Sequence, residues 1–176
     1  MKDKSIDFLD LFEKNFNILE SRIFNLYEKK FYIESVILMS NIVEGLLVIM
    51  IEDQENYLAN ILQEKTIKFQ PKKLDALIKK TLGQLIENFS IYSKDTILIS
   101  NLNNFNSLRV NMAHKLLTNS DIRKEDIRAK EIFKKYISLK NNLLKNHIDL
   151  NNDLQKELNM KIEKIRERRQ IANLQN

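Results

Sequence analysis

Hydrophobic residues recur at helical spacing along almost the whole chain. A first amphipathic segment runs from about Ser5 to Tyr27, and a second runs from about Phe31 to Leu62. Apolar positions three and four residues apart indicate helices that pack one face against a core. The second segment is apolar on nearly all sides between Val36 and Ile51. Because such a helix must be covered all round, we expect it to form the centre of a helical bundle.

Four further segments with helical spacing follow the apolar one. They run from about Pro71 to Phe89, from Lys94 to Leu117, from Ser120 or Asp121 to Lys145, and from Leu150 to Leu174. Proline is favoured in the first turn of a helix, and Ser93 or Asp95 is suited to cap the next one. We therefore predict an all-α protein, an up-and-down helical bundle of about five helices in residues 1–148. Residues 149–176 form a C-terminal helix with a basic end, either an extension of the bundle or an oligomerisation element.

The composition agrees with a helical bundle and excludes several kinds of site. The 176 residues are 43% hydrophobic and 30% charged, with only two Gly and one Pro. Folds rich in turns need more of both residues, so helices joined by short polar loops are favoured. Cysteine is absent, which excludes disulfides, thiolate ligands and cysteine nucleophiles, and two histidines alone cannot form a zinc site. We expect neither a metal nor a cofactor.

Charge and hydropathy also bear on location and partners. The first amphipathic segment contains acids such as Asp7, so we expect no signal peptide and a cytoplasmic protein. The apolar run Val36–Ile51 is short and contains polar residues, so we expect no membrane span. The net charge of +5 and the pI of about 9.2 favour an anionic partner such as nucleic acid.

A polar patch interrupts the apolar helix. Ser40, Asn41 and Glu44 lie within about one turn of one another. An acid in such surroundings needs a partner, because burying an unpaired charge is costly. Arg109, on the helix predicted from Lys94 to Leu117, lies beside the packing face and has the same requirement. We therefore predict a Glu44–Arg109 ion pair that joins the two helices.

On the helix predicted from Lys94 to Leu117, Arg109 and His114 are the residues that suggest chemistry. Five positions correspond to about 140° beyond a full turn, so on a straight helix the two side chains do not share a face. Asn103, Ser107, Asn111 and His114 follow one another at steps of four, four and three, which places them in one polar stripe. The Arg–His spacing alone is a weak signal, and the stripe and the Glu44 patch are what make it a candidate site.

The string from Arg109 to His114 resembles the motif of HEPN domains, an Arg followed by four to six residues and a His. That motif often occurs as Arg-Asn-x-x-Ala-His, and Arg109, Ala113 and His114 match this form. The resemblance extends to an upstream apolar helix that contains an acid, here Glu44, and to a capped amphipathic helix downstream. It covers about residues 33–144. Val110 departs from the pattern, because members that cleave RNA usually have a polar residue directly after the Arg.

The resemblance implies a metal-independent endoribonuclease of the toxin or phage-defence type. In that chemistry a ribose 2′-hydroxyl attacks the adjacent phosphorus. The resemblance assigns proton transfer to His114 and charge stabilisation to Arg109, with Asn111, Glu44 and Ser107 in supporting roles. Family members dimerise so that two motifs face one RNA cleft, which implies a homodimer. An antitoxin or a nucleotidyltransferase is the implied protein partner.

Two other functions fit the same residues. The chain is alternatively a catalytically inactive HEPN-like binding module that partners a nucleotidyltransferase or an antitoxin, with Val110 as the mark of inactivity. It is alternatively a helical interaction protein in which the helix after Leu150 pairs with a partner helix. We interpret His147 as a surface residue. The basic end of the last helix is a solvated face, an RNA contact or a partner-binding element; its cations are Lys164, Arg166, Arg168 and Arg169.

Overall fold

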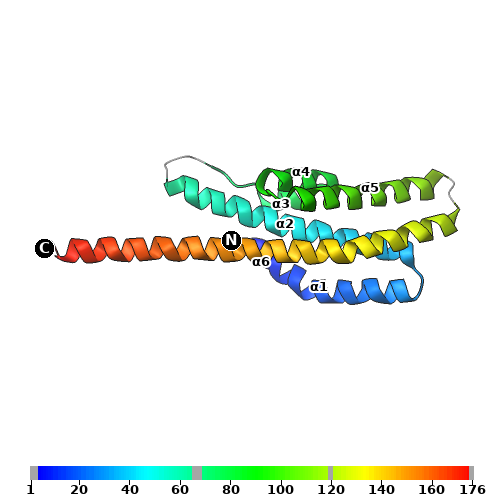
Figure 1. Cartoon of the computed structure of the whole chain (residues 1–176), viewed down its shortest axis with the longest axis horizontal. Coiled ribbons are helices and arrows are strands. Elements are labelled where there is room, and N and C mark those ends of the chain that lie inside the picture. The colour runs from blue at the N-terminus through cyan, green and yellow to red at the C-terminus, as the bar shows by residue number, and fades with distance from the viewer. Residues whose placement is uncertain (1–3, 65–68, 119–120, 175–176) are drawn as a thin grey trace. The chain divides into compact units, whose positions relative to one another are not determined.

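The computed structural model describes residues 4–64, 69–118 and 121–174, which contain six helices and no strand (Figure 1). The chain is 89% helical, which confirms the predicted all-α helical bundle. The helices are α1 (Lys4–Glu28), α2 (Tyr32–Glu64), α3 (Leu74–Ile78), α4 (Leu82–Tyr92), α5 (Thr96–Thr118) and α6 (Ile122–Leu174).

Helix α2 forms the centre of the packing, as its all-round apolarity predicts. It packs against α1, α3 and α4, and α4 packs in turn against α5. Most of its side chains between residues 36 and 51 are buried, among them Val36, Met39, Ile42, Val43, Leu46, Leu47, Met50 and Ile51. Burying this many branched and unbranched aliphatic side chains supplies the main favourable term in the folding of the bundle.

By length and composition, α2 is the one described helix that could cross a membrane. The span Tyr32–Leu62 has a mean hydropathy of 1.8 over its most apolar window, so the helix extends beyond the run Val36–Ile51, and the expectation of no membrane span stays a prediction. The polar residues Ser40, Asn41 and Glu44 do not interrupt the helix, since all three are helical, and Ser40 and Glu44 form hydrogen bonds. Of that window, 61% is buried inside the structure, as in the core helix of a bundle.

Gly45, next to Glu44, allows α1 to approach α2 closely. A Cβ atom at position 45 would lie 2.0 Å from Cε2 of Phe12, far inside van der Waals contact. The Phe12 ring of α1 therefore occupies the space that any other residue at position 45 would fill. Glycine is unfavourable within a helix by about 1 kcal/mol relative to Ala, and the close packing of the ring accounts for its presence here.

The helix predicted from Pro71 to Phe89 is two helices, α3 and α4. The break occurs because Thr81 starts a new helix with a capping box. The backbone N–H of Gln84 donates to Thr81 Oγ1 over 3.4 Å, and the backbone N–H of Thr81 donates to Gln84 Oε1 over 3.0 Å. Pro71 precedes α3 rather than lying in its first turn.

Asp residues cap the last two helices. Asp95 Oδ1 accepts from the backbone N–H of Leu98 over 2.9 Å at the start of α5, and Asp121 Oδ1 accepts from that of Arg123 over 3.1 Å before α6. These contacts agree with two of the predicted caps; the alternative cap Ser120 lies outside the described residues.

Helix α6 is one continuous helix of 53 residues, so the predicted break between Lys145 and Leu150 is wrong. Residues 146–152 are mostly polar but include no Gly or Pro, and nothing in them stops a helix. The chain divides into two compact units, Met1–Leu143 and Leu144–Asn176, where the sequence predicted a boundary between residues 148 and 149. All the sites described below lie in the first unit.

Candidate functional site

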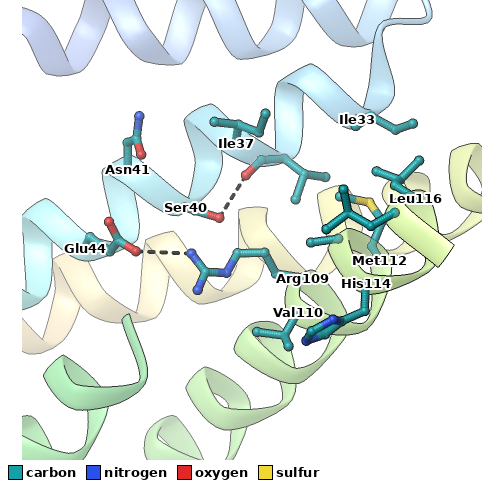
Figure 2. Close-up of a pocket in the computed structure, with 13 residues that line it drawn as sticks. Ile33, Ile37, Ser40, Asn41, Glu44, Arg109, Val110, Met112, His114 and Leu116 are labelled. Atoms are coloured by element: carbon teal, nitrogen blue, oxygen red, sulfur yellow. Dashed lines mark hydrogen bonds and ion pairs between the residues drawn. The ribbon is translucent and has the colours of Figure 1, made fainter. Parts of the chain in front are cut away.

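A groove of about 470 Å³ lies between α2 and α5, and both Arg109 and His114 line it (Figure 2). Its walls are mostly apolar, with polar groups from both helices. From α2 they comprise Ile33, Val36, Ile37, Ser40, Asn41 and Glu44, and from α5 Arg109, Val110, Met112, Ala113, His114, Leu116 and Leu117. The polar patch of α2 and the Arg–His motif of α5 therefore face the same space.

Arg109 joins the two helices through an ion pair with Glu44. Its Nη1 donates to Glu44 Oε1 over 3.2 Å, which confirms the predicted pair (Figure 2). Its Nη2 donates to Asn106 Oδ1 over 3.1 Å, one turn back along α5. The Arg109 side chain stays 27% exposed, so the guanidinium is held in place from two sides while part of it remains accessible from the groove.

Glu44, on α2, has polar partners on two other helices, α5 and α4. Besides Arg109 on α5, it accepts a hydrogen bond from the backbone of Leu82, the first residue of α4. Burial raises the pKa of Glu44, and the charge and hydrogen bond of Arg109 together with the Leu82 backbone oppose that rise without cancelling it. The carboxylate is therefore less stable in its charged form than an exposed one, and Arg109 is the partner that stabilises it.

The other two members of the α2 patch have no such link to α5. Ser40 is buried, and its hydroxyl donates to the backbone carbonyl of Val36 over 2.9 Å, within its own helix (Figure 2). Asn41 lines the groove with an exposed side chain. Of the predicted patch, Glu44 alone makes a described polar contact across the groove.

His114 lies at the end of the groove away from Glu44. Its side chain is exposed, and its ring lies beside Val110, whereas the Arg109 guanidinium points toward Glu44 (Figure 2). The two side chains of the motif therefore diverge within one chain, as the helical angle between positions 109 and 114 predicts. One copy of the motif does not bring both groups onto a single atom of a substrate.

Ser107 and Asn111 are exposed, and neither lines the groove. The polar stripe is therefore the solvent face of α5, and Val110 takes the groove position that Asn111 was expected to share. The supporting roles predicted for Ser107 and Asn111 remain predictions. Asn106, which the sequence analysis missed, is the polar residue that contacts Arg109, and its position three residues before Arg109 is the signal that could have identified it.

The remaining predicted features lie away from the groove. His147 Nε2 lies 3.2 Å from Asn151 Nδ2, one turn further along α6, so this histidine forms a local contact on its own helix. The basic side chains predicted at the end of α6, from Lys164 to Arg169, lie outside the described ones. Among the described residues, no group of three or more His, Asp and Glu side chains is placed to hold a metal ion.

Comparison with known proteins adds no relative. No protein-family model, no curated protein and no solved structure matches the chain. The chemistry of the groove therefore depends on its own residues, and the HEPN resemblance on the short motif and the order of the helices.

Proposed function

We propose that the chain is a cytoplasmic, HEPN-like, metal-independent endoribonuclease of the toxin or phage-defence type. Two copies place their Arg109 and His114 side chains in one RNA cleft. The observation that carries the proposal is the groove itself, where a partly exposed arginine anchored by Glu44 and an exposed histidine line one wall.

The proposed reaction needs a proton acceptor, a proton donor and a cation. The ribose 2′-oxygen forms a bond to phosphorus as its proton leaves, and the bond from phosphorus to the 5′-oxygen breaks as that oxygen gains a proton. His114 takes part in the proton transfers, because an imidazole can both accept and donate near neutral pH. Arg109 stabilises the extra charge on the phosphoryl oxygens, which a guanidinium can bind in a bidentate manner. The products are a 2′,3′-cyclic phosphate and a 5′-hydroxyl.

The divergence of Arg109 and His114 supports a homodimer. A two-fold axis beside the groove would double a sparse set of groups and let the Arg109 of one copy act with the His114 of the other. Exposed apolar side chains border the groove, among them Ile37 at 58% and Leu117 at 84% exposure. Large aliphatic groups exposed together favour burial against another protein surface.

Glu44 acts as a positioning residue in this proposal. It holds the Arg109 guanidinium through the ion pair, and burial raises the pKa of Glu44, so that its own charge is only partly stabilised. A phosphate in the groove would add a second anionic partner for Arg109.

One observation favours the inactive binding module as a second candidate. Val110 lines the groove where members that cleave RNA usually carry a polar residue, and Asn111 lies outside it. A chain of this kind would bind RNA, an antitoxin or a nucleotidyltransferase through the same groove and cleave nothing.

The test is RNA cleavage by the purified full-length chain in excess EDTA. The expected result is 2′,3′-cyclic phosphate ends, with the rate reduced about 100-fold or more in Arg109→Ala and in His114→Ala. Arg123→Ala and His147→Ala are matched controls, because they remove the same side chains outside the groove and should retain the wild-type rate.

Three outcomes would overturn the ribonuclease proposal. Activity that survives in both Arg109→Ala and His114→Ala would remove the site. RNA binding without cleavage by the wild-type chain would favour the inactive module instead, and a dimer that cleaves only with EDTA absent would exclude the metal-independent mechanism.

A further inference from the structure

A second concave site lies where α1 ends and α2 begins. It has a volume of about 480 Å³ and shares no residue with the groove. Its lining is formed by Ser21, Arg22, Asn25, Leu26, Lys29 and Phe31, which we call the corner pocket. Ser21, Asn25 and Lys29 follow one another at steps of four, so one face of α1 supplies most of the wall.

The corner pocket is built on a Schellman motif that ends α1. The backbone N–H of Phe31 donates to the carbonyl of Leu26 over 2.8 Å, and that of Lys30 donates to the carbonyl of Tyr27 over 3.0 Å. This motif usually brings its two apolar residues together, and here these are Leu26 and Phe31, both in the pocket lining. The pocket is therefore fixed by backbone hydrogen bonds.

Lys30 occupies the position of this motif where glycine is normally found. Its φ of 66° is in the left-handed region, and it is the one described non-glycine residue with positive φ. A side chain in this conformation costs about 1 kcal/mol or more relative to glycine. The chain thus keeps a cation, beside Lys29 and Phe31, at a position where glycine would give a more stable fold.

The charges around the pocket have no described acidic partner. Arg22 and Lys29 line it, no acid does, and neither cation forms an ion pair with an acidic residue in the described part of the chain. Glu20 and Glu28, the acids next to the lining residues in sequence, are not among them, and Glu20 pairs with Lys140. Two cations with Lys30 beside them therefore present positive charge to an anionic ligand.

Phe31 adds an aromatic surface to these cations. Its side chain is 50% exposed, and the lining that it shares also contains the amide of Asn25 and the hydroxyl of Ser21. Single-stranded nucleic acid is bound by this combination, in which cations contact the backbone and bases stack on aromatic rings. We propose that the corner pocket binds a nucleotide of single-stranded RNA, with its base on Phe31 and its phosphate between Arg22, Lys29 and Lys30.

The shape favours RNA over an anionic membrane surface. A bilayer would need a convex face with several apolar side chains, whereas this site is concave and offers one aromatic ring with hydrogen-bonding groups around it. The corner pocket is also close to the groove. Phe31 lines the first and Ile33 the second, and two residues of chain separate their Cα atoms by at most about 7 Å. The two sites are therefore adjacent along the chain.

This proposal goes beyond the ribonuclease proposal, because binding at the corner requires no cleavage. The test uses the full-length chain and a fluorescein-labelled 12-nucleotide single-stranded RNA whose 2′-hydroxyls are methylated, so that it cannot be cleaved. Fluorescence anisotropy gives Kd at several salt concentrations.

Arg22→Ala and Lys29→Ala should each weaken binding about 5-fold at 0.1 M salt and reduce the salt slope by about 0.7 per lost phosphate contact. Phe31→Leu, which keeps an apolar side chain but removes the ring, should weaken binding about 5-fold or more with the salt slope unchanged. Lys124→Ala, an exposed lysine on α6, is the control for the loss of one positive charge and should bind as the wild type does.

Lys30→Gly separates binding from folding. It should raise the midpoint of thermal unfolding, because it relieves the positive φ, and yet weaken RNA binding, because it removes a cation. A variant that is better folded but binds RNA less well cannot owe its loss of affinity to damage of the fold.

The proposal is overturned if the three substitutions in the pocket leave Kd unchanged. It is also overturned if they abolish binding to phosphatidylserine vesicles while RNA binding stays as in the wild type. If the wild-type chain does not cleave RNA but its RNA binding still depends on Phe31, the ribonuclease proposal alone is contradicted. Normal binding by all corner variants together with cleavage that requires His114 would contradict the corner proposal alone.

Discussion

Two acids of α2, Glu44 and Glu55, lie on the same side of the helix but differ in their burial and in their partners. They are eleven residues apart, which is about three full turns. Glu55 is buried and accepts from the Tyr92 hydroxyl over 2.7 Å, from the backbone N–H of Lys72, and from Lys72 Nζ over 3.2 Å. The Glu44 side chain is 31% exposed, and its charged partner Arg109 is also partly open to solvent.

The difference separates a structural acid from a functional one. Glu55 connects the segment before α3 and the end of α4 to the core, and its donors are directed inward. Glu44 holds a cation whose remaining surface faces a groove. A buried acid with several donors stabilises the fold, whereas a half-buried acid with one exposed cationic partner can position that partner for a ligand.

The largest expected difference between the two acids concerns activity. Removing the partner of Glu44 with Arg109→Ala should lower the cleavage rate about 100-fold or more but change the free energy of unfolding by about 1 kcal/mol or less, because the pair is partly exposed. Removing the hydroxyl partner of Glu55 with Tyr92→Phe should leave the rate unchanged. Rate measurements and urea unfolding on both variants test this, and a slow Tyr92→Phe enzyme would contradict the separation.

The next largest difference concerns stability. Glu55→Ala should lower the free energy of unfolding by about 2–4 kcal/mol, because it leaves the Tyr92 hydroxyl and the Lys72 N–H without their acceptor. Glu44→Ala should lower it by about 1 kcal/mol or less. Urea unfolding monitored by circular dichroism measures both values. Equal losses would mean that Glu44 is as structural as Glu55.

A third prediction uses alkaline pH to examine the Glu55 cluster. Burial, with the hydrogen bond to Glu55 and its charge, raises the pKa of Tyr92 to about 12. A phenol whose pKa is raised by folding contributes stability that is fully present below pH 10 and is lost as the pH rises through about 12. The difference in unfolding free energy between wild type and Tyr92→Phe should therefore decrease between pH 9 and pH 12. A constant difference would show that the hydroxyl is not held as described.

The smallest prediction concerns the charge of Glu44. Because burial raises the pKa of Glu44, its contribution to stability is present below its unfolded pKa of about 4.5 and is lost as the pH rises through the folded value. Relative to Glu44→Gln, which does not titrate, the wild type should be more stable at pH 4 than at pH 7, by about 1 kcal/mol or less. Unfolding of both proteins at the two pH values measures the change, and a difference of opposite sign would mean that Arg109 outweighs burial.

The sequence predicted the charged partner of Glu44 but not the partners of Glu55. An acid in an apolar helix and an arginine beside another packing face each require a partner, which predicted the Glu44–Arg109 pair. Glu55 lies near the polar end of α2 and carries no such signal. Its burial depends on where the segment containing Lys72 and the end of α4 come to lie, and helical periodicity does not encode either position.

Helix positions followed from periodicity, and helix boundaries depended on local chemistry. The core helix and the start of α5 were predicted closely. The break before Thr81 was missed because the apolar stripe continues across it, although the Thr81–Gln84 capping box was visible in the sequence. The positive φ of Lys30 was not predictable, because lysine is not a residue that marks the left-handed conformation.

The apolarity of α2 has a consequence for synthesis of the protein. By length and composition alone, the helix Tyr32–Leu62 meets the criteria for a membrane span, as the core helix of a bundle also can. A charged residue at the centre of such a segment opposes insertion by about 3 kcal/mol. Glu44 lies near the middle of this span and therefore also directs the nascent helix toward its partner helices. Replacing it by leucine would do more than free Arg109, because it would also remove one of the charges that oppose insertion in a membrane.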